Sequence, residues 1–299
     1  MSVVDLAVMY GHLEGAGRDF ARDPTGHLSI EAGIFAKHGL NVSWNHVQGT
    51  EERYRRLEDG SAQISLVVGR ASLQHFLTSR TTRIIGCAMN SCPYYLVVAP
   101  SVTKLADLKN KTVACREGPS RNTPIAETFE KLAGLRVGEE IALQQPPGDQ
   151  DVFNLLVEGK VAGALLPRPF SFVAEARGFK RIPDWPDIVD DPLPITIETT
   201  AKLWRDGEKD LRVFLTAHGE GIRYFKSHRA DALRVLEKRF GHAPTLAEKA
   251  LSDYVVCMDE SLKVDLSHFE KLLAQVAPEK AVEARDLASE WIVPGAIKS

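Results

Sequence analysis

The sequence predicts an α/β protein of two similar lobes with a helical C-terminal region. Over the first two thirds of the chain, apolar β-branched runs alternate with helix-like runs, which is typical of α/β folds with parallel sheets. A helix, a glycine stop and an apolar strand recur once in each half. The last third keeps only helical periodicity. A length of 299 residues independently favours two domains.

The composition excludes several classes of protein. The chain carries 37 basic and 40 acidic residues, and this balance argues against a dedicated nucleic-acid binder. Four cysteines in 299 residues are too few for a disulfide scaffold. No apolar run approaches the roughly 18 residues of a membrane span. We therefore expect neither nucleic acid nor a membrane span among its interactions.

The first half is predicted to alternate strands and helices and to end in two strands. Glycines follow two of the helices, at Gly39 and Gly60, where a left-handed backbone ends a helix easily. The expected elements are Val3–Tyr10, Ile30–His38, Leu40–His46, Glu51–Asp59, Gln63–Val68, Ala71–Leu77, Arg83–Cys87 and Tyr94–Ala99.

The same pattern then restarts in the second half. Gly159 stops a helix and precedes an apolar strand, as Gly60 does in the first half. Any α/β protein repeats helix, glycine and strand, so this repeat by itself leaves open whether the two halves are copies. The expected elements are a turn at Leu105–Leu108, then Thr112–Cys115, Ile125–Ala133, Ile141–Gln145, Asp151–Glu158 and Gly163–Leu166.

The final third is predicted to be mostly helical. Asp210–Ser227 and Ala230–Phe240 carry apolar residues at spacings of three and four. Thr245 with Glu248, and Ser267 with Glu270, match the capping box that begins a helix. The proline-rich acidic stretch from Pro183 to Pro194 is interpreted as a connection between the lobes.

Several segments resemble the nitrate/sulfonate/taurine-type solute-binding proteins of ABC transporters. Gly33–Val42 matches their G-x-F-x-x-x-G-L-x-V pattern, and Leu105–Ala114 is similar to L-x-D-L-K-G-K-x-V-A, with Asn110 at the usual glycine. Leu156–Leu165 and the helix near Arg212–Phe225 also match in order and spacing. Each motif is short, and the likeness extends over nearly the whole chain.

The resemblance implies a type II periplasmic-binding-protein fold, in which two α/β lobes close on a ligand in the cleft between them. On that pattern, lobe 1 comprises residues 1–97 and 199–299, and lobe 2 comprises residues 98–198. The same fold also carries cytoplasmic enzymes, among them thiamine-pyrimidine synthases, aromatic decarboxylases and an aryl-sulfinate desulfinase.

The loop after the first strand is one candidate site. Ligands of open α/β sheets bind beyond the carboxyl ends of the strands, where this loop lies. Tyr10 and Gly11 begin a glycine-rich stretch that could approach a ligand closely, and His12 and Glu14 could supply acid–base chemistry. Cys92 is a candidate catalytic thiol near the first crossover. The alternatives are a solvated surface loop and a buried structural cysteine.

Two arginines follow other predicted strands. In Gly69-Arg70-Ala71-Ser72, the backbone amides and the Ser72 hydroxyl could bind a ligand, and Arg70 could pair with a carboxylate or sulfonate. Ser72 could equally cap the following helix. Arg168 lies between two prolines after another strand, where a rigid guanidinium could clamp an anion or face solvent.

A third loop has the composition of an anion cradle. Gly118, Ser120, Arg121, Asn122 and Thr123 immediately precede an expected helix, whose first amides favour anions. No Gly-Lys-Ser/Thr signature is present, so the loop is not a P-loop. An ordinary turn with a helix cap is the structural alternative.

Two functions therefore remain open. The first is a solute-binding protein that takes a small anionic or polar organic ligand, such as a sulfonate, a carboxylate or an N-heterocycle, and that serves an ABC transporter permease if it is exported. The second is a cytoplasmic enzyme on the same fold, a decarboxylase, desulfinase or pyrimidine-synthase-like lyase. Neither a zinc-site spacing nor a dinucleotide fingerprint is visible, so no metal and no cofactor is expected.

The N-terminus bears on the choice between them. The segment from Met1 to Tyr10 has no basic region and contains Asp5, so it predicts a strand and not a signal peptide. The sequence as written predicts a cytoplasmic protein, and a leader removed from the chain would make it periplasmic.

Overall fold

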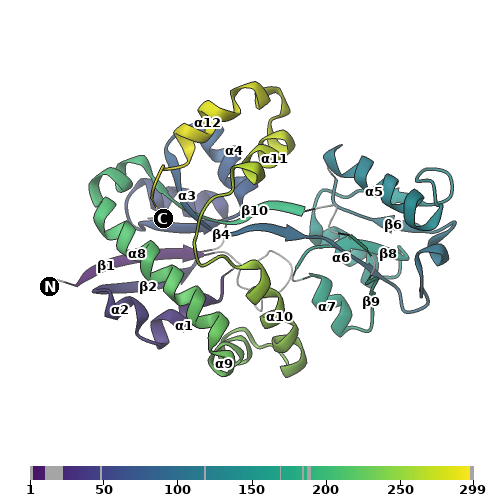
Figure 1. Cartoon of the computed structure of the whole chain (residues 1–299), viewed down its shortest axis with the longest axis horizontal. Coiled ribbons are helices and arrows are strands. Elements are labelled where there is room, and N and C mark those ends of the chain that lie inside the picture. The colour runs from purple at the N-terminus through teal and green to yellow at the C-terminus, as the bar shows by residue number, and fades with distance from the viewer. Residues whose placement is uncertain are drawn as a thin grey trace. The chain divides into compact units, whose positions relative to one another are not determined.

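The chain divides into two compact α/β units in a computed structural model (Figure 1). The structure describes residues 3–10, 23–47, 49–117, 119–168, 170–183, 185–186 and 190–296. Unit 1 takes the described residues up to Ser91 and from Pro192 onward, and unit 2 takes those of Cys92–Asp191. These divisions fall a few residues before the lobe boundaries predicted after residues 97 and 198.

Unit 1 is built on a five-stranded mixed sheet with the order β2-β1-β3-β10-β4. β1 pairs in parallel with both β2 and β3, and β10 is antiparallel to β3. All four residues of β3 are buried, as its uninterrupted apolar run predicts. The strands are β1 (Val4–Tyr10), β2 (Leu40–His46), β3 (Ile64–Val67), β4 (Thr82–Pro93) and β10 (Asp190–Thr200).

Helices cover both faces of this sheet. In Figure 1, α4, α11 and α12 lie on one side of it and α1, α2 and α8 on the other. Phe76, Phe269 and Trp291 form the centre of the core on the α4 side. The helices that precede β4 are α1 (Thr25–Glu31), α2 (Ile34–Lys37), α3 (Thr50–Glu58) and α4 (Gly69–Ser79).

Unit 2 repeats the design with a second five-stranded sheet, of order β7-β6-β8-β5-β9. β6 pairs in parallel with β7 and β8, and β5 is antiparallel to β8 and β9. The strands are β5 (Tyr95–Val98), β6 (Thr112–Ala114), β7 (Ala142–Gln144), β8 (Gly163–Leu166) and β9 (Lys180–Arg181). The helices are η1 (Leu105–Leu108), α5 (Pro119–Ala133), α6 (Asp149–Val157) and α7 (Phe170–Ala176).

The C-terminal third is helical, as predicted, and belongs to unit 1. Its longest helix, α8, has one non-helical residue, Gly207. The helices are α8 (Ala201–Ser227), α9 (Arg229–Phe240), α10 (Pro244–Cys257), α11 (Leu266–Val276), η2 (Pro278–Glu283) and α12 (Ala284–Trp291). Together with the two sheets, they confirm the predicted α/β fold with a helical C-terminal region.

Some local predictions are wrong. The segment Ile30–His38, expected to form one helix, is divided between α1 and α2. Gly33 separates the two helices, because its φ of 70° lies in the left-handed region and interrupts the helix. Neither capping box forms: α10 begins at Pro244 after Ala243, and Asp265 caps α11 by accepting from the Ser267 amide. The proline-rich stretch does contain a boundary between the two units, after Asp191, and β10 already begins within it at Asp190.

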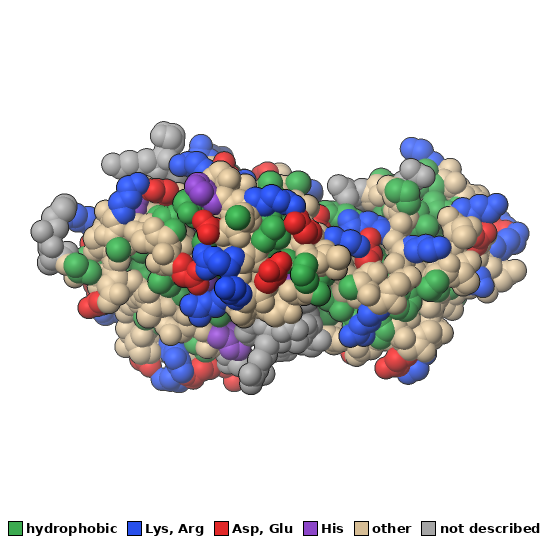
Figure 2. All heavy atoms as spheres, turned by 90° about the horizontal axis from the view of Figure 1, so that it is seen from below, with side chains coloured by type: hydrophobic (Ala, Val, Ile, Leu, Met, Phe, Trp, Pro, Cys, Tyr) green, Lys and Arg blue, Asp and Glu red, His purple; other side chains and the backbone are tan. Residues whose placement is uncertain are grey.

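The described surface is mixed in charge. Figure 2 shows basic and acidic side chains interspersed on the face that it presents, in keeping with the net charge of −3. Among the described helices, none combines the length and the apolar character needed to cross a lipid bilayer.

Candidate functional site

Aromatic and imidazole rings gather where β1 and β2 of unit 1 end. Tyr10 is the last residue of β1, and its hydroxyl lies 3.0 Å from Nε2 of His27. His46 pairs with Tyr10 in the sheet, with 5.7 Å between ring centroids. Trp44 stacks against Tyr10 at 6.0 Å. Burial raises the pKa of Tyr10, so this phenol is a neutral hydrogen-bonding group.

The sequence singled out Tyr10 but not its imidazole neighbours. The register of the parallel β1–β2 pair places His46 beside Tyr10, and α1 places His27 there. Strand pairing would have identified His46, because both residues end adjacent strands. Gly11, His12 and Glu14 lie outside the described residues, so their predicted roles stay predictions.

The loop Gly69–Ser72 forms the first turn of α4, directly after β3. Gly69 is required by packing, because a Cβ there would lie 2.7 Å from the Leu193 carbonyl oxygen. Arg70 is half-buried and donates to the Gln275 side chain at 3.2 Å. Ala71 is also half-buried.

Ser72 does not have the helix-capping role considered for it, and its role in ligand binding stays a prediction. The N-cap of α4 is Val68, so Ser72 does not cap the helix. Its side chain is fully buried and its hydroxyl donates to Glu198 Oε1 at 2.7 Å. Burial raises the pKa of Glu198 to about 7, against the lowering effect of the Ser72 hydrogen bond. Glu198 was not expected from the sequence.

The cysteines near the end of β4 are buried. Cys92 retains 6% exposure, and its Sγ approaches the Pro93 carbonyl oxygen at 4.0 Å. Cys87 donates to the carbonyl oxygens of Met89 and Ile195, and burial raises the pKa of its thiol well above the ordinary value. The raised pKa of Cys87 is typical of an inert structural thiol, and the catalytic role of Cys92 stays a prediction.

Unit 2 has its own cluster at the carboxyl end of its central strands. Arg116 follows β6 and forms an ion pair of 3.0 Å with Asp149, the first residue of α6. The Tyr94 hydroxyl donates to the same carboxylate at 3.1 Å. Sequence reasoning missed all three residues, although Arg116 stands directly after a predicted strand. The pair is largely buried, and its charges offset each other.

The first turn of α5 presents polar groups beside this cluster. Gln145, just after β7, donates to Oδ1 of Asn122 at 2.6 Å. That contact orients the Asn122 amide, whose Nδ2 has no hydrogen-bond acceptor among the described residues. Thr123 is exposed next to it. Gly118 lies outside the described residues, and the structure describes only the backbone of Ser120 and Arg121.

Arg168 lies after β8, also in unit 2. Its Nη2 donates to the Tyr95 hydroxyl at 3.0 Å. Arg181 stacks on the Tyr95 ring at 3.7 Å and pairs with Glu175 at 3.3 Å. Arg168, which the sequence proposes as an anion-binding group, is therefore hydrogen-bonded to a tyrosine of its own unit.

Two helix ends stand at the carboxyl ends of parallel strands. No cluster of three or more His, Cys, Asp or Glu side chains that could hold a metal occurs among the described residues. Helices α4 and α5 each begin after the carboxyl end of a parallel strand, and their first amides lack helical acceptors. Such helix ends favour an anion.

Comparisons with known proteins give no match by sequence and many by structure. No protein-family model matches the chain, and no curated protein sequence matches it. The structure matches the periplasmic aliphatic sulphonate binding protein SsuA from Escherichia coli, with a TM-score of 0.65 at 14% identity, over 99% of this chain and 98% of that one.

Two further solved structures are similar. The alkanesulfonate-binding protein SsuA from Xanthomonas axonopodis pv. citri, bound to MOPS, gives a TM-score of 0.59 at 12% identity over 99% and 98% of the two chains. The periplasmic nitrate-binding protein NrtA from Synechocystis PCC 6803 gives 0.65 at 12% identity over 97% and 86%. The chain thus has the two-unit fold of the periplasmic solute-binding proteins, as its sequence resemblance predicts.

Proposed function

We propose that this protein is a solute-binding protein for a small organic or inorganic anion. The observation that carries the proposal is the first turn of α5, where exposed Asn122 and Thr123 offer donors next to helix amides. The likeness to sulfonate- and nitrate-binding proteins over nearly the whole chain supports the same ligand class.

The arrangement at Asn122 explains how an anion would be recognised. Because Gln145 occupies the Asn122 carbonyl oxygen, the amide nitrogen is left as the available group. The Arg116–Asp149 pair contributes no net charge, so this end of α5 acts through the partial positive charge of the helix and the neutral donors of Asn122 and Thr123. Neutral donors of this kind suit a singly charged ligand such as a sulfonate.

The first experiment is mass spectrometry after dialysis against a mixed panel. The panel contains alkyl and aryl sulfonates, nitrate, sulfinates, aromatic carboxylates and pyrimidines. We expect an anion to be retained on the protein with its mass unchanged. Retention of no compound, or only of a neutral pyrimidine, would contradict the proposal. Depletion of a compound with a new mass appearing would indicate an enzyme instead.

Variants at Asn122 then test the site with the retained anion. We expect Asn122→Ala to weaken binding roughly 3- to 10-fold, the effect of one lost hydrogen bond. Asn122→Asp should weaken it further, because it places a negative charge against an anion at nearly constant size. Asn41→Ala is the matched control, since Asn41 is an exposed asparagine with one hydrogen bond, to Asp5 in unit 1. Tighter binding by the Asp variant would exclude an anion at this position.

Contacts between the ligand and residues of unit 1 stay a prediction. Arg70 is the cation of that unit that the sequence proposes for the ligand. Arg70→Gln should lower affinity roughly 10- to 100-fold if its guanidinium makes a charged hydrogen bond to the anion. Unchanged affinity in a calorimetric titration would remove Arg70 from the site while leaving the role of Asn122 intact.

We also infer that the protein serves an ABC import system from the periplasm. A protein of this fold from Staphylococcus aureus is the ligand-binding component of such a system, and the E. coli sulphonate-binding protein is periplasmic. Fractionation of cells that express the native gene tests the location. Recovery of the protein with cytosolic markers would contradict this inference without touching anion binding.

A further inference from the structure

A groove of about 700 Å³ runs along α8 in unit 1, away from the residues discussed above. One wall is α8, another is the segment between α10 and α11, and Ala296 lies at its edge. Figure 1 shows that segment passing beside α8. The charged residues that line the groove are Lys209, Arg212, Glu220, Arg223, Glu260 and Lys263.

The walls of the groove are held in place by the fold. Gly219 lets the Glu260 carbonyl sit against α8, since a Cβ there would lie 2.5 Å from that oxygen. The Leu262 carbonyl accepts from the Cys87 amide of β4 at 2.8 Å. Arg212 donates to the Ala296 carbonyl oxygen at 2.8 Å and so fixes the edge. The groove is therefore preorganised.

The basic residues that line the groove are spread along α8. Lys209 and Arg223 are separated by fourteen residues, which is roughly 21 Å at 1.5 Å per residue. Fourteen residues are close to four whole turns, so both side chains lie on one face of α8. The only non-helical residue of α8, Gly207, precedes this stretch.

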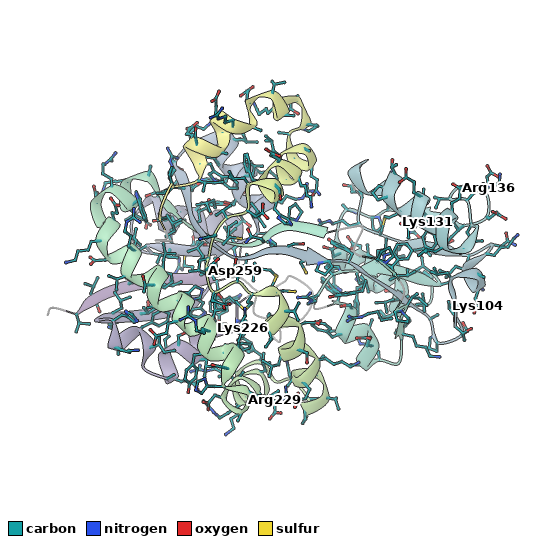
Figure 3. The ribbon with its side chains drawn as sticks, viewed as in Figure 1. Lys104, Lys131, Arg136, Lys226, Arg229 and Asp259 are labelled. Atoms are coloured by element: carbon teal, nitrogen blue, oxygen red, sulfur yellow. The ribbon has the colours of Figure 1, made fainter. Side chains whose placement is uncertain are left out.

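The groove keeps a positive charge after its internal pairing. Glu220 is paired with Lys37 at 2.7 Å, and Glu260 is paired with Lys226. Figure 3 labels Lys226 on α8 and Asp259 at the start of the facing segment. Among the described residues, none forms an ion pair or hydrogen bond with the charged ends of Lys209, Arg223 or Lys263.

We propose that this groove binds an extended acidic peptide segment of a partner protein. Lys209 and Arg223 are too far apart along α8 for one small anion to reach both. An extended chain rises about 3.3 Å per residue, so six residues extend about 20 Å, close to the distance from Lys209 to Arg223. Acidic side chains along such a segment complement both ends, and the apolar floor at Val213 and Leu215 accepts the chain between them.

The test is fluorescence anisotropy with a labelled hexaglutamate peptide in about 20 mM salt. The groove variant is Arg223→Gln with Lys263→Gln. The control is Lys202→Gln with Arg205→Gln, which removes the same charge from exposed positions on α8 before Gly207. We expect the groove variant to weaken peptide binding about five-fold or more and the control to weaken it clearly less, because the Lys202 and Arg205 side chains do not line the groove.

Three outcomes would overturn the proposal. One is failure of the peptide to bind the native protein. Another is an equal loss in both variants, which would indicate attraction to overall charge only. The third is competition by citrate at the affinity of the peptide, which would indicate a small-anion site. Circular dichroism of both variants verifies folding. A further variant, Lys209→Glu, reverses one charge of the groove and should also weaken binding of the peptide.

Discussion

The Ser72 hydroxyl donates a 2.7 Å hydrogen bond to the Glu198 carboxylate, and neither side chain has any exposed surface. The contact joins the first turns of α4 to β10, next to the central strand β3. A carboxyl group in such surroundings is costly when charged, so its partners matter for stability and for the response to pH.

Ser72→Ala should lower the free energy of unfolding by about 1–3 kcal/mol, because it leaves a buried acceptor without its donor. Urea denaturation followed by circular dichroism measures the change. Ser61→Ala is the control, since the Ser61 hydroxyl is exposed and its contact with Arg56 is long, at 3.5 Å. An equal effect of the two substitutions would contradict a special role for the buried contact.

Glu198 predicts a pH dependence of stability. Its pKa rises from 4.5 to about 7 on folding, chiefly through burial, while Arg53 and the hydroxyls of Ser72, Thr82 and Tyr54 oppose the rise. The folded protein therefore binds this proton more tightly than the unfolded chain. Its contribution is fully present below about pH 4.5 and is lost as the pH rises through 7.

Glu198→Gln isolates this contribution. The wild type should lose stability relative to the variant between pH 5 and pH 8, by an amount on the order of 3 kcal/mol at most. Parallel urea titrations at several pH values measure the difference. If the free energies of unfolding of the wild type and the variant change in parallel with pH, Glu198 does not titrate in this range.

Gly26 predicts a steric effect in the core of unit 1. A Cβ at this position would lie 2.2 Å from the Trp44 ring, so Gly26→Ala should cost about 1–3 kcal/mol through forced displacement. Gly207→Ala is the matched control, because no atom lies within 4 Å of its Cβ and its φ of −126° suits alanine. We expect the control to be neutral or slightly stabilising in thermal unfolding.

The buried pair of Asp23 and His218 predicts a coupled loss of stability. Nε2 of His218 lies 2.9 Å from Oδ2 of Asp23, and both side chains are fully buried. Either single alanine variant should cost about 3–5 kcal/mol, because it leaves the other group buried without its partner. The double variant should cost less than the sum of the two. Additive losses in a double-mutant cycle would indicate independent roles.

Much of the fold could be predicted from local pattern. The strand at Leu40–His46 and the strand at Gly163–Leu166 have the predicted bounds, since each is an apolar or alternating run next to a glycine stop. Helix starts were predicted less well, because the capping-box residues at Thr245 and Ser267 had competitors nearby, Pro244 and Asp265.

The candidate site was predicted only by position along the chain. The sequence placed Asn122 and Thr123 in a loop before a helix that starts at Ile125, whereas they lie in α5, which already begins at Pro119. Arg116 and Asp149 are far apart in sequence, and β6 and α6 bring them to 3.0 Å. No pattern in the local sequence predicts such an ion pair.

By itself, the sequence determined the α/β class, the two halves and the helical last third, because periodicity and glycine stops act within one element. The tertiary structure decided which polar residues have partners within the fold and which stay exposed. Ser72 and Arg168 follow predicted strands as Asn122 does, yet Glu198 and Tyr95 occupy their side chains. A side chain's partners come from elements distant in the chain, and only packing brings those elements together.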